Sequence, residues 1–269
     1  FKDVNQIARG IVANNYNSYF AGNSDLVNSS FHNLSLFYRS FNLFNNSSVF
    51  ARVNYRKTAD QVNRNTNFVP GAPVSSSTTV NSPFSNESLT SFFSASKSIK
   101  KIQFRLGGNF SYSKIYQSLN NRESLNKIYN TGLNTRIGTN FRTAPNVSLN
   151  YRVSFSNQDN SDRSQKSVTH APSISFDAYI WNSVTFTTDY AFTEVSQNGS
   201  DTNSFDIWNA KLAYRKDKDA KWEYEIVANN ILGTGSQSSV AINSFDLSTT
   251  VNERFILPRF ISFRVRYQL

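Results

Sequence analysis

The stretch from residue 147 to residue 156 reads VSLNYRVSFS and decides the fold class of this chain. Its odd-numbered positions hold apolar or aromatic residues, and its even-numbered positions hold Ser, Asn or Arg. A period of two residues is the spacing of a β-strand with one apolar and one polar face. We therefore predict a strand here whose two faces meet different surroundings.

The same alternation recurs along the chain and predicts an all-β protein. Between residues 102 and 112, for example, Ile, Phe, Leu and Tyr alternate with Gln, Arg, Asn and Ser. Many such stretches exceed the usual soluble strand of about 5–6 residues and reach the roughly 9–11 residues of a tilted membrane-spanning strand. We predict eleven strands, near residues 29–41, 48–59, 86–97, 101–117, 127–143, 147–158, 168–180, 183–197, 204–216, 221–235 and 258–269.

The composition combines many aromatic residues with a polar background. The chain of 269 residues has 23 Phe, 13 Tyr and 3 Trp, yet its mean hydropathy is −0.47. It contains no apolar run long enough for a transmembrane helix. The net charge is +10, but the Lys and Arg residues are spread along the chain, which disfavours nucleic acid as a partner. The absence of Cys fits an oxidising compartment such as the periplasm.

The links between the predicted strands alternate in length. Short links are predicted at 42–47, 98–100, 144–146, 181–182 and 217–220, and long polar loops without structure of their own at 60–85, 118–126, 159–167, 198–203 and 236–257. Outer-membrane barrels alternate short periplasmic turns with longer extracellular loops. With residue 269 in the periplasm, every long link falls outside. Apolar residues in 236–257 leave one added strand open, and such a strand would invert every earlier side.

The predicted fold is an all-β transmembrane antiparallel β-barrel, because strands exposed to lipid must close to satisfy their backbone groups. A soluble antiparallel sheet with one solvated face shows the same alternation, although strand length and aromatic density disfavour it. Several arginines would not fit a dry core, so they are predicted to face the lumen: Arg39, Arg52, Arg105, Arg136, Arg152, Arg264 and Arg266. The residues predicted to face lipid include Phe104, Ile137, Val153, Phe263 and Val265.

Three segments resemble a known family. ERFILPRFISFRVRYQL (253–269) is similar to the last strand of TonB-dependent receptors, and WEYEIVANNILGTGS (222–236) is similar to the strand before it. AGNSDLVNSSFHNLSLFYRSF (21–41) resembles a segment earlier in the barrel. The likeness is strongest to barrels of the Bacteroidota, including the SusC-like branch. Ser24 stands where the family usually has Pro, and Leu269 where it usually has Phe.

The resemblance implies a barrel of about 22 strands, of which residues 1–269 form the C-terminal portion. The plug domain and the first half of the barrel would belong to a longer polypeptide. This expectation agrees with the odd number of predicted strands and with the start at Phe1. The alternating residues Phe263, Val265, Tyr267 and Leu269 resemble the C-terminal signal read by the barrel-assembly machinery.

The resemblance also implies a function, namely nutrient uptake by a TonB-dependent receptor in the bacterial outer membrane. Its partners would be outer-membrane lipid, lipopolysaccharide, the assembly machinery and, through the N-terminal part, TonB; a surface lipoprotein as a cap stays open. A transport-silent barrel that serves as a structural subunit of an envelope complex is the alternative. A small stand-alone porin or adhesin is a third class.

Residues for catalysis or metal binding are sparse. The only histidines are His32 and His170, and no Ser-His or Asp-His set is evident. Asp159 and Asp162 with neighbouring Asn residues match no defined Ca²⁺ loop. We therefore predict no enzyme, cofactor or metal. The three tryptophans are predicted at strand ends as part of an aromatic girdle at the lipid boundary: Trp181, Trp208 and Trp222.

Overall fold

The computed structural model describes residues 4–8, 10–68, 71, 74–142, 145–160, 163–181, 183–198, 201–217, 219–243 and 248–268. Within these residues the chain forms seventeen strands and one short helix, α1 (Val4–Ile7). No helix in this part of the chain is long and apolar enough to cross a membrane. The predominance of strands confirms the all-β prediction.

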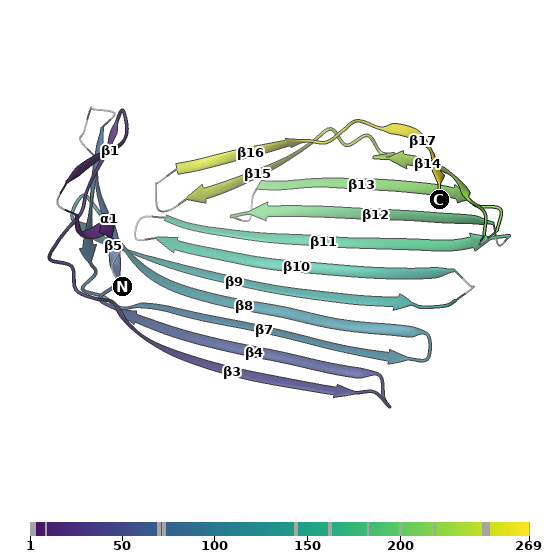
Figure 1. The fold of residues 1–269 in the computed structure, drawn as a ribbon, viewed down its shortest axis with the longest axis horizontal. Coiled ribbons are helices and arrows are strands. Elements are labelled where there is room, and N and C mark those ends of the chain that lie inside the picture. Colours follow the sequence, from purple (N-terminus) through teal and green to yellow (C-terminus); the bar gives the residue numbers. More distant parts are fainter. Residues whose placement is uncertain are drawn as a thin grey trace.

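Eleven antiparallel strands form one long curved wall (Figure 1). They are β3 (Ser30–Asn42), β4 (Ser47–Ala59), β7 (Asn86–Ile99), β8 (Ile102–Leu119), β9 (Arg122–Thr139), β10 (Asn146–Asn160), β11 (Arg163–Ile180), β12 (Val184–Gln197), β13 (Asp201–Tyr214), β14 (Trp222–Asn229) and β17 (Phe260–Tyr267). Each of the eleven predicted ranges overlaps one of these strands, so these eleven strands are confirmed. The wall is not closed, because among the described residues β3 pairs only with β4 and β17 only with β14.

Six further strands were missed. Four of them, β1 (Ile11–Asn15), β2 (Ser18–Ala21), β5 (Val62–Phe68) and β6 (Ser75–Asn81), form a side limb that joins the end of β8. In this limb β2 pairs with β6, and β5 with β8, in parallel. The whole sheet of fifteen strands is therefore mixed, and the prediction of a purely antiparallel sheet holds for the wall but is wrong for the limb.

The two longest predicted loops contain hairpins. Segment 60–85 holds β5 and β6, and segment 236–257 holds β15 (Ser236–Asn243) and β16 (Ser248–Phe255). The limb is tied to β8 by polar side chains, because Asn63 Nδ2 donates to the Tyr116 carbonyl at 2.7 Å. Such Ser- and Asn-rich strands lack an apolar stripe, so alternation did not predict them. Segment 236–257 adds two strands rather than one, so the direction of every earlier strand is unchanged.

Three other predicted loops, at 118–126, 159–167 and 198–203, are wrong. The flanking strands extend into these segments, and β8 and β9 pair as far as Leu119 and Arg122. Only Asn120 and Asn121 remain in the turn, with φ of 50° and 60°, the two positive values of a tight hairpin turn. Polarity in these segments marks residues in contact with water, whereas the backbone still pairs as a hairpin.

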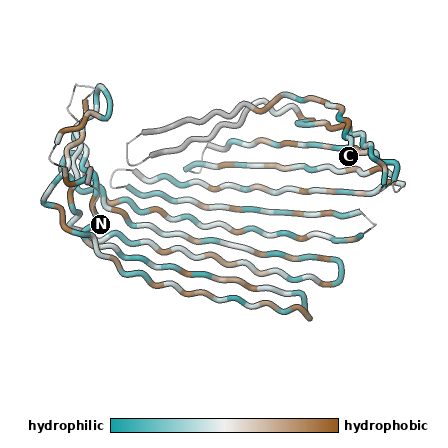
Figure 2. Tube along the Cα trace, in the orientation of Figure 1, coloured by the Kyte–Doolittle hydropathy of each residue, from teal (hydrophilic) through white to brown (hydrophobic). Residues whose placement is uncertain are grey.

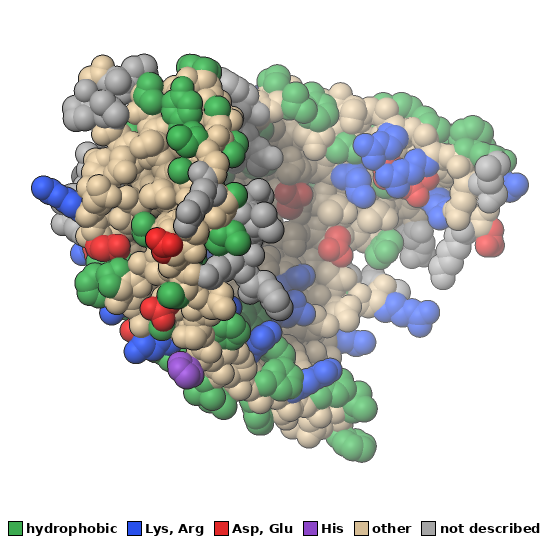
Figure 3. Space-filling model, turned by 60° about the vertical axis from the view of Figure 1, so that its left-hand side comes forward, with side chains coloured by type: hydrophobic (Ala, Val, Ile, Leu, Met, Phe, Trp, Pro, Cys, Tyr) green, Lys and Arg blue, Asp and Glu red, His purple; other side chains and the backbone are tan. Residues whose placement is uncertain are grey.

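The register separates the side chains of the wall into two faces. Phe104 lies opposite Ile137 and Ile137 opposite Leu149, whereas Arg105 lies opposite Arg136. Residues that lie directly opposite each other share a face, so apolar residues lie beside apolar residues and polar beside polar across these strands. Figure 2 shows the alternation of hydropathy along the strands. Figure 3 looks into the hollow of the curved sheet, where Lys and Arg side chains gather.

The strands are also staggered. One row of paired residues starts at Ser47, beside the β3–β4 turn, and runs through Phe104 and Ile174 to Trp208, in the interior of β13. Stagger of this kind accompanies the strand tilt of a barrel. The prediction that all three tryptophans lie at strand ends is therefore wrong for Trp208. Trp181 lies in the β11–β12 turn and Trp222 begins β14.

Candidate functional site

Three of the predicted lumen-facing arginines lie together on the polar face. Arg105, Arg136 and Arg152 come from the adjacent strands β8, β9 and β10, and all three are exposed. Arg105 stands directly opposite Arg136, while Arg152 is opposite Asn134, two residues from Arg136. Within the described residues, none of the three has a hydrogen-bond or ion-pair partner. We call these residues the arginine trio.

A low polar floor adjoins the trio. Gly107 lies opposite Asn134, and Gly132 lies opposite Asn109, on the same two strands. A Cβ atom on Gly107 would be 2.6 Å from Asn134 Oδ1, and one on Gly132 would be 2.5 Å from Asn109 Oδ1. Each glycine therefore makes room for the opposite amide to lie across its strand. The floor carries amide groups but no bulky side chain.

Aromatic residues border this floor on the β4–β7 side. Phe92 lies opposite Asn109, and its ring centroid is 5.7 Å from that of Phe50, which is 5.3 Å from Phe37. We did not predict these three residues as part of the polar face. The sequence contains the signal, because each of them stands in its strand where the residues two positions before and after it are polar. Arg39 and Arg52, predicted to face inward, share this face opposite Phe50 and Phe37.

The other two predicted arginines belong to an ion-pair cluster near the C-terminus. Arg264 Nη1 and Arg266 Nη2 each lie 3.3 Å from Glu225 Oε2, and Lys211 Nζ lies 3.9 Å from Glu225 Oε1. Arg266 also reaches Glu223 at 3.7 Å. The side chain of Glu225 is only 1% exposed. Thus Arg264 and Arg266 lie on the polar face, where they form ion pairs with carboxylates, and sequence reasoning missed Glu225.

The opposite face of the wall is apolar and exposed. Phe104 is 40% exposed, Ile137 49% and Phe263 66%, and Val265 is exposed as well. Val153 shares this face but is only 8% exposed, because it lies between the larger Leu133 and His170. It is therefore a covered residue rather than a surface one. Tyr267 belongs to the same face, whereas Leu269 lies outside the described residues.

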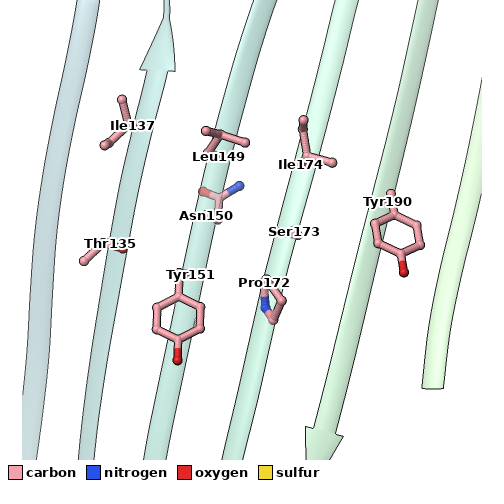
Figure 4. A pocket seen from close by; sticks show the side chains of 9 residues that line it. All are labelled: Thr135, Ile137, Leu149, Asn150, Tyr151, Pro172, Ser173, Ile174 and Tyr190. Carbon is pink, nitrogen blue, oxygen red and sulfur yellow. The ribbon is translucent and has the colours of Figure 1, made fainter. Parts of the chain in front are cut away.

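A shallow apolar hollow of about 440 Å³ lies on this second face. Figure 4 shows its lining side chains, which come from β9, β10, β11 and β12 and include Ile137, Leu149 and Ile174. Pro172 also lines it, in the interior of β11. Proline has no N–H to donate, and the β11–β12 pairing is interrupted at this point, between His170 and Ser173. The arginine trio is not part of this hollow.

Charged residues return to the apolar face where β7, β8 and β9 extend furthest. Lys114 Nζ lies 3.7 Å from Glu87 Oε1 and 5.5 Å from the Tyr116 ring centroid. The Tyr116 side chain, with a smaller contribution from Glu87, raises the pKa of Lys114. Burial raises the pKa of the Glu123 carboxyl. The apolar surface therefore ends before the hairpins do.

The residues weighed for catalysis or Ca²⁺ binding engage in local contacts. His170 Nδ1 lies 2.7 Å from the Tyr151 hydroxyl. Asp159 accepts hydrogen bonds from Ser164 and from Asn157, and Asp162 lies outside the described residues. In the described part of the chain, no three His, Cys, Asp or Glu side chains gather as a metal site would require.

Comparison with protein-family models and with curated proteins gives no match to this chain. The likeness to TonB-dependent receptors therefore rests on the three segments quoted above.

Proposed function

We propose that this chain is the C-terminal wall of an outer-membrane β-barrel of the TonB-dependent-receptor type, which takes part in nutrient uptake. One observation carries the proposal. The apolar face holds an exposed band without charged residues that is as tall as the hydrocarbon core of a membrane, and it lies opposite a basic face.

The height of the band follows from the positions of its bounding charges. The apolar-face positions are free of charge from Ile102 to Tyr112 on β8, from Tyr129 to Thr139 on β9 and from Val147 to Phe155 on β10. Lys114, Lys127 and Asp159 then end the band. Each stretch has the roughly 9–11 residues that a tilted strand needs to cross the hydrocarbon core.

Lys97 is a charged residue on the same face of β7. It lies close to the end of that strand, and its Nζ donates to Asn45 Oδ1 at 3.4 Å, in the β3–β4 turn. A lysine near a strand end can extend to the membrane boundary in this way. Large apolar side chains are exposed along this face on many neighbouring strands, whereas soluble monomers rarely expose contiguous apolar patches of more than a few hundred Å². Lipid is therefore the solvent that fits this face.

The arrangement of the strand ends supports one orientation. The turns at 42–47, 99–102, 139–146, 180–184 and 214–222 lie at the same end of the wall as the C-terminal strand end (Figure 1). We assign this end to the periplasm and the opposite end, with the limb and the extended hairpins, to the cell exterior. Closure of the wall requires partners for the free edges of β3 and β17, which further strands of a roughly 22-stranded barrel would supply.

Uptake fits this wall because its curved polar face would line a wide lumen. The experiment uses the gene for the full-length protein. Its deletion should abolish growth on at least one limiting nutrient, and a strain without TonB should show the same defect. Unchanged growth on every nutrient, together with stable co-purification of other envelope proteins, would contradict transport and favour the structural-subunit role.

A further inference from the structure

The arginine trio is a set of three positive charges without counter-charge on adjacent strands, unlike the cations of the polar face near the C-terminus. Lys211, Arg264 and Arg266 share the buried carboxylate of Glu225. On β8, β9 and β10 the polar face of the described residues carries no acidic side chain.

Neighbouring strands do not supply the missing charge. The acidic residues on the same face of β11 and β12 are Asp177 and Asp189. Asp177 lies opposite Asn146, and Asp189 accepts a hydrogen bond of 2.9 Å from Asn209 Nδ2. Neither forms an ion pair with the trio within the described residues.

The arrangement of the trio carries an energetic cost. Arg105 and Arg136 are direct cross-strand neighbours, so their Cβ atoms are about 4.5–5.5 Å apart, and like charges at such positions destabilise a sheet. The concave surface also concentrates their positive potential. A bound anion would turn this repulsion into attraction.

We propose that the arginine trio binds a small solute with two or more negative charges, carried by carboxylate or phosphate groups. The proposal rests on the proposed function and names the substrate class for it. A guanidinium group presents a planar fork of donors that matches both kinds of anion. Neighbouring strands are about 4.8 Å apart, so three guanidinium groups from three adjacent strands can reach one small molecule.

The floor beside the trio suits the rest of such a solute. Gly107 and Gly132 keep it low, and the amide groups of Asn109 and Asn134 have no hydrogen-bond partner in the described structure. Each amide offers both donors and an acceptor. Phe92, opposite Asn109, limits the site on the far side. The solute is therefore expected to carry polar groups next to its charged end.

The test is isothermal titration calorimetry on the full-length protein, purified in detergent at low salt with chloride as the only buffer anion. The probes are pyrophosphate, succinate and uncharged glucose. The wild type should bind at least one of the two anions and should not bind glucose, and the preferred anion identifies the charged group. Arg136→Gln should weaken that binding at least about tenfold, because it removes charge-assisted hydrogen bonds.

Two further variants make the result interpretable. Arg152→Gln should weaken binding as well and replaces Arg136→Gln if that variant does not fold. The matched control is Arg39→Gln, which changes an exposed arginine of the same face on β3 and should leave binding within about twofold.

Two results would overturn the proposal. One is a wild type that binds neither anion at millimolar concentration, as expected if acidic groups elsewhere in the polypeptide neutralise the trio. The other is an equal loss of binding in Arg39→Gln. Binding in detergent requires neither transport nor a membrane. A negative binding result can therefore be distinguished from a negative result in the growth test of the proposed function.

Discussion

Arg105 and Arg136 stand directly opposite each other on β8 and β9, both on the polar face of the wall. Since like charges in this position repel, Arg105→Gln should stabilise the purified protein by about 0.5 kcal/mol in low-salt chloride buffer. Thermal unfolding would measure the gain, which should shrink at about 1 M salt, where the Debye length is about 3 Å. Arg39→Gln is the control, because Arg39 lies opposite Phe50. Equal shifts in both variants would contradict the repulsion.

Glu225 is expected to stabilise the C-terminal strands. Its removal by Glu225→Gln leaves Lys211, Arg264 and Arg266 without their shared carboxylate. Because Glu225 is buried but its partners are about half exposed, we expect a loss of about 2–4 kcal/mol. Glu223→Gln, which breaks one partly exposed pair with Arg266, should cost less than about 1 kcal/mol. Denaturant unfolding in detergent compares the two, and similar losses would show that the cluster is not the cause.

The two faces of β11 should tolerate charge very differently. Ile174 lies on the apolar face, and Ser173, its neighbour in sequence, lies on the polar face. Ile174→Arg should destabilise the protein in lipid vesicles by about 2–4 kcal/mol if the residue is near the midplane. Ser173→Arg should cost much less, because its side chain meets water. If Ser173→Arg lost more unfolding free energy in vesicles than Ile174→Arg, the assignment of the lipid and lumen faces would be reversed.

The sides of the membrane can be tested with epitope tags at tight turns. A tag between Asn120 and Asn121, in the β8–β9 turn, should be detected on intact cells. A tag between Lys100 and Lys101, in the β7–β8 turn, should be detected only after the outer membrane is permeabilised. Both positions lie in turns between paired strands, although the Asn120 N–H also donates to the Thr66 carbonyl of the limb. The reverse pattern of antibody binding would invert the orientation of the wall.

The wall could be predicted from sequence because its strands carry a strong apolar stripe. From Ile102 to Tyr112 every second residue lies on the apolar face, so the pattern predicts both the strand and its two faces. The pattern weakens where both faces meet water. For this reason the hairpin ends around Asn120, and the strands β5 and β6 of the limb, were predicted as loops.

The polar face could be predicted only in part. The alternation of apolar and polar residues assigned Arg105, Arg136 and Arg152 to the polar face. It could not show that Arg105 stands opposite Arg136, because that depends on the register between the strands. It also could not separate this unpaired trio from Arg264 and Arg266, whose partner Glu225 looks like any other polar residue in its strand. Likewise, the alternation places Val153 among the exposed apolar residues. Only the folded sheet shows that its cross-strand neighbours cover it.

The most direct test of the membrane-spanning wall is a cysteine scan along β10 of the full-length protein in a cysteine-free background. Each position from 147 to 156 is changed to Cys in turn, and cells with a permeabilised outer membrane receive a water-soluble maleimide. Even-numbered positions other than the buried Ser148, including Asn150 and Arg152, should react, whereas odd-numbered positions, including Leu149 and Tyr151, should be protected by lipid. Uniform reaction at all positions would contradict a wall that spans the membrane, and reaction confined to the odd positions would contradict the assignment of its faces.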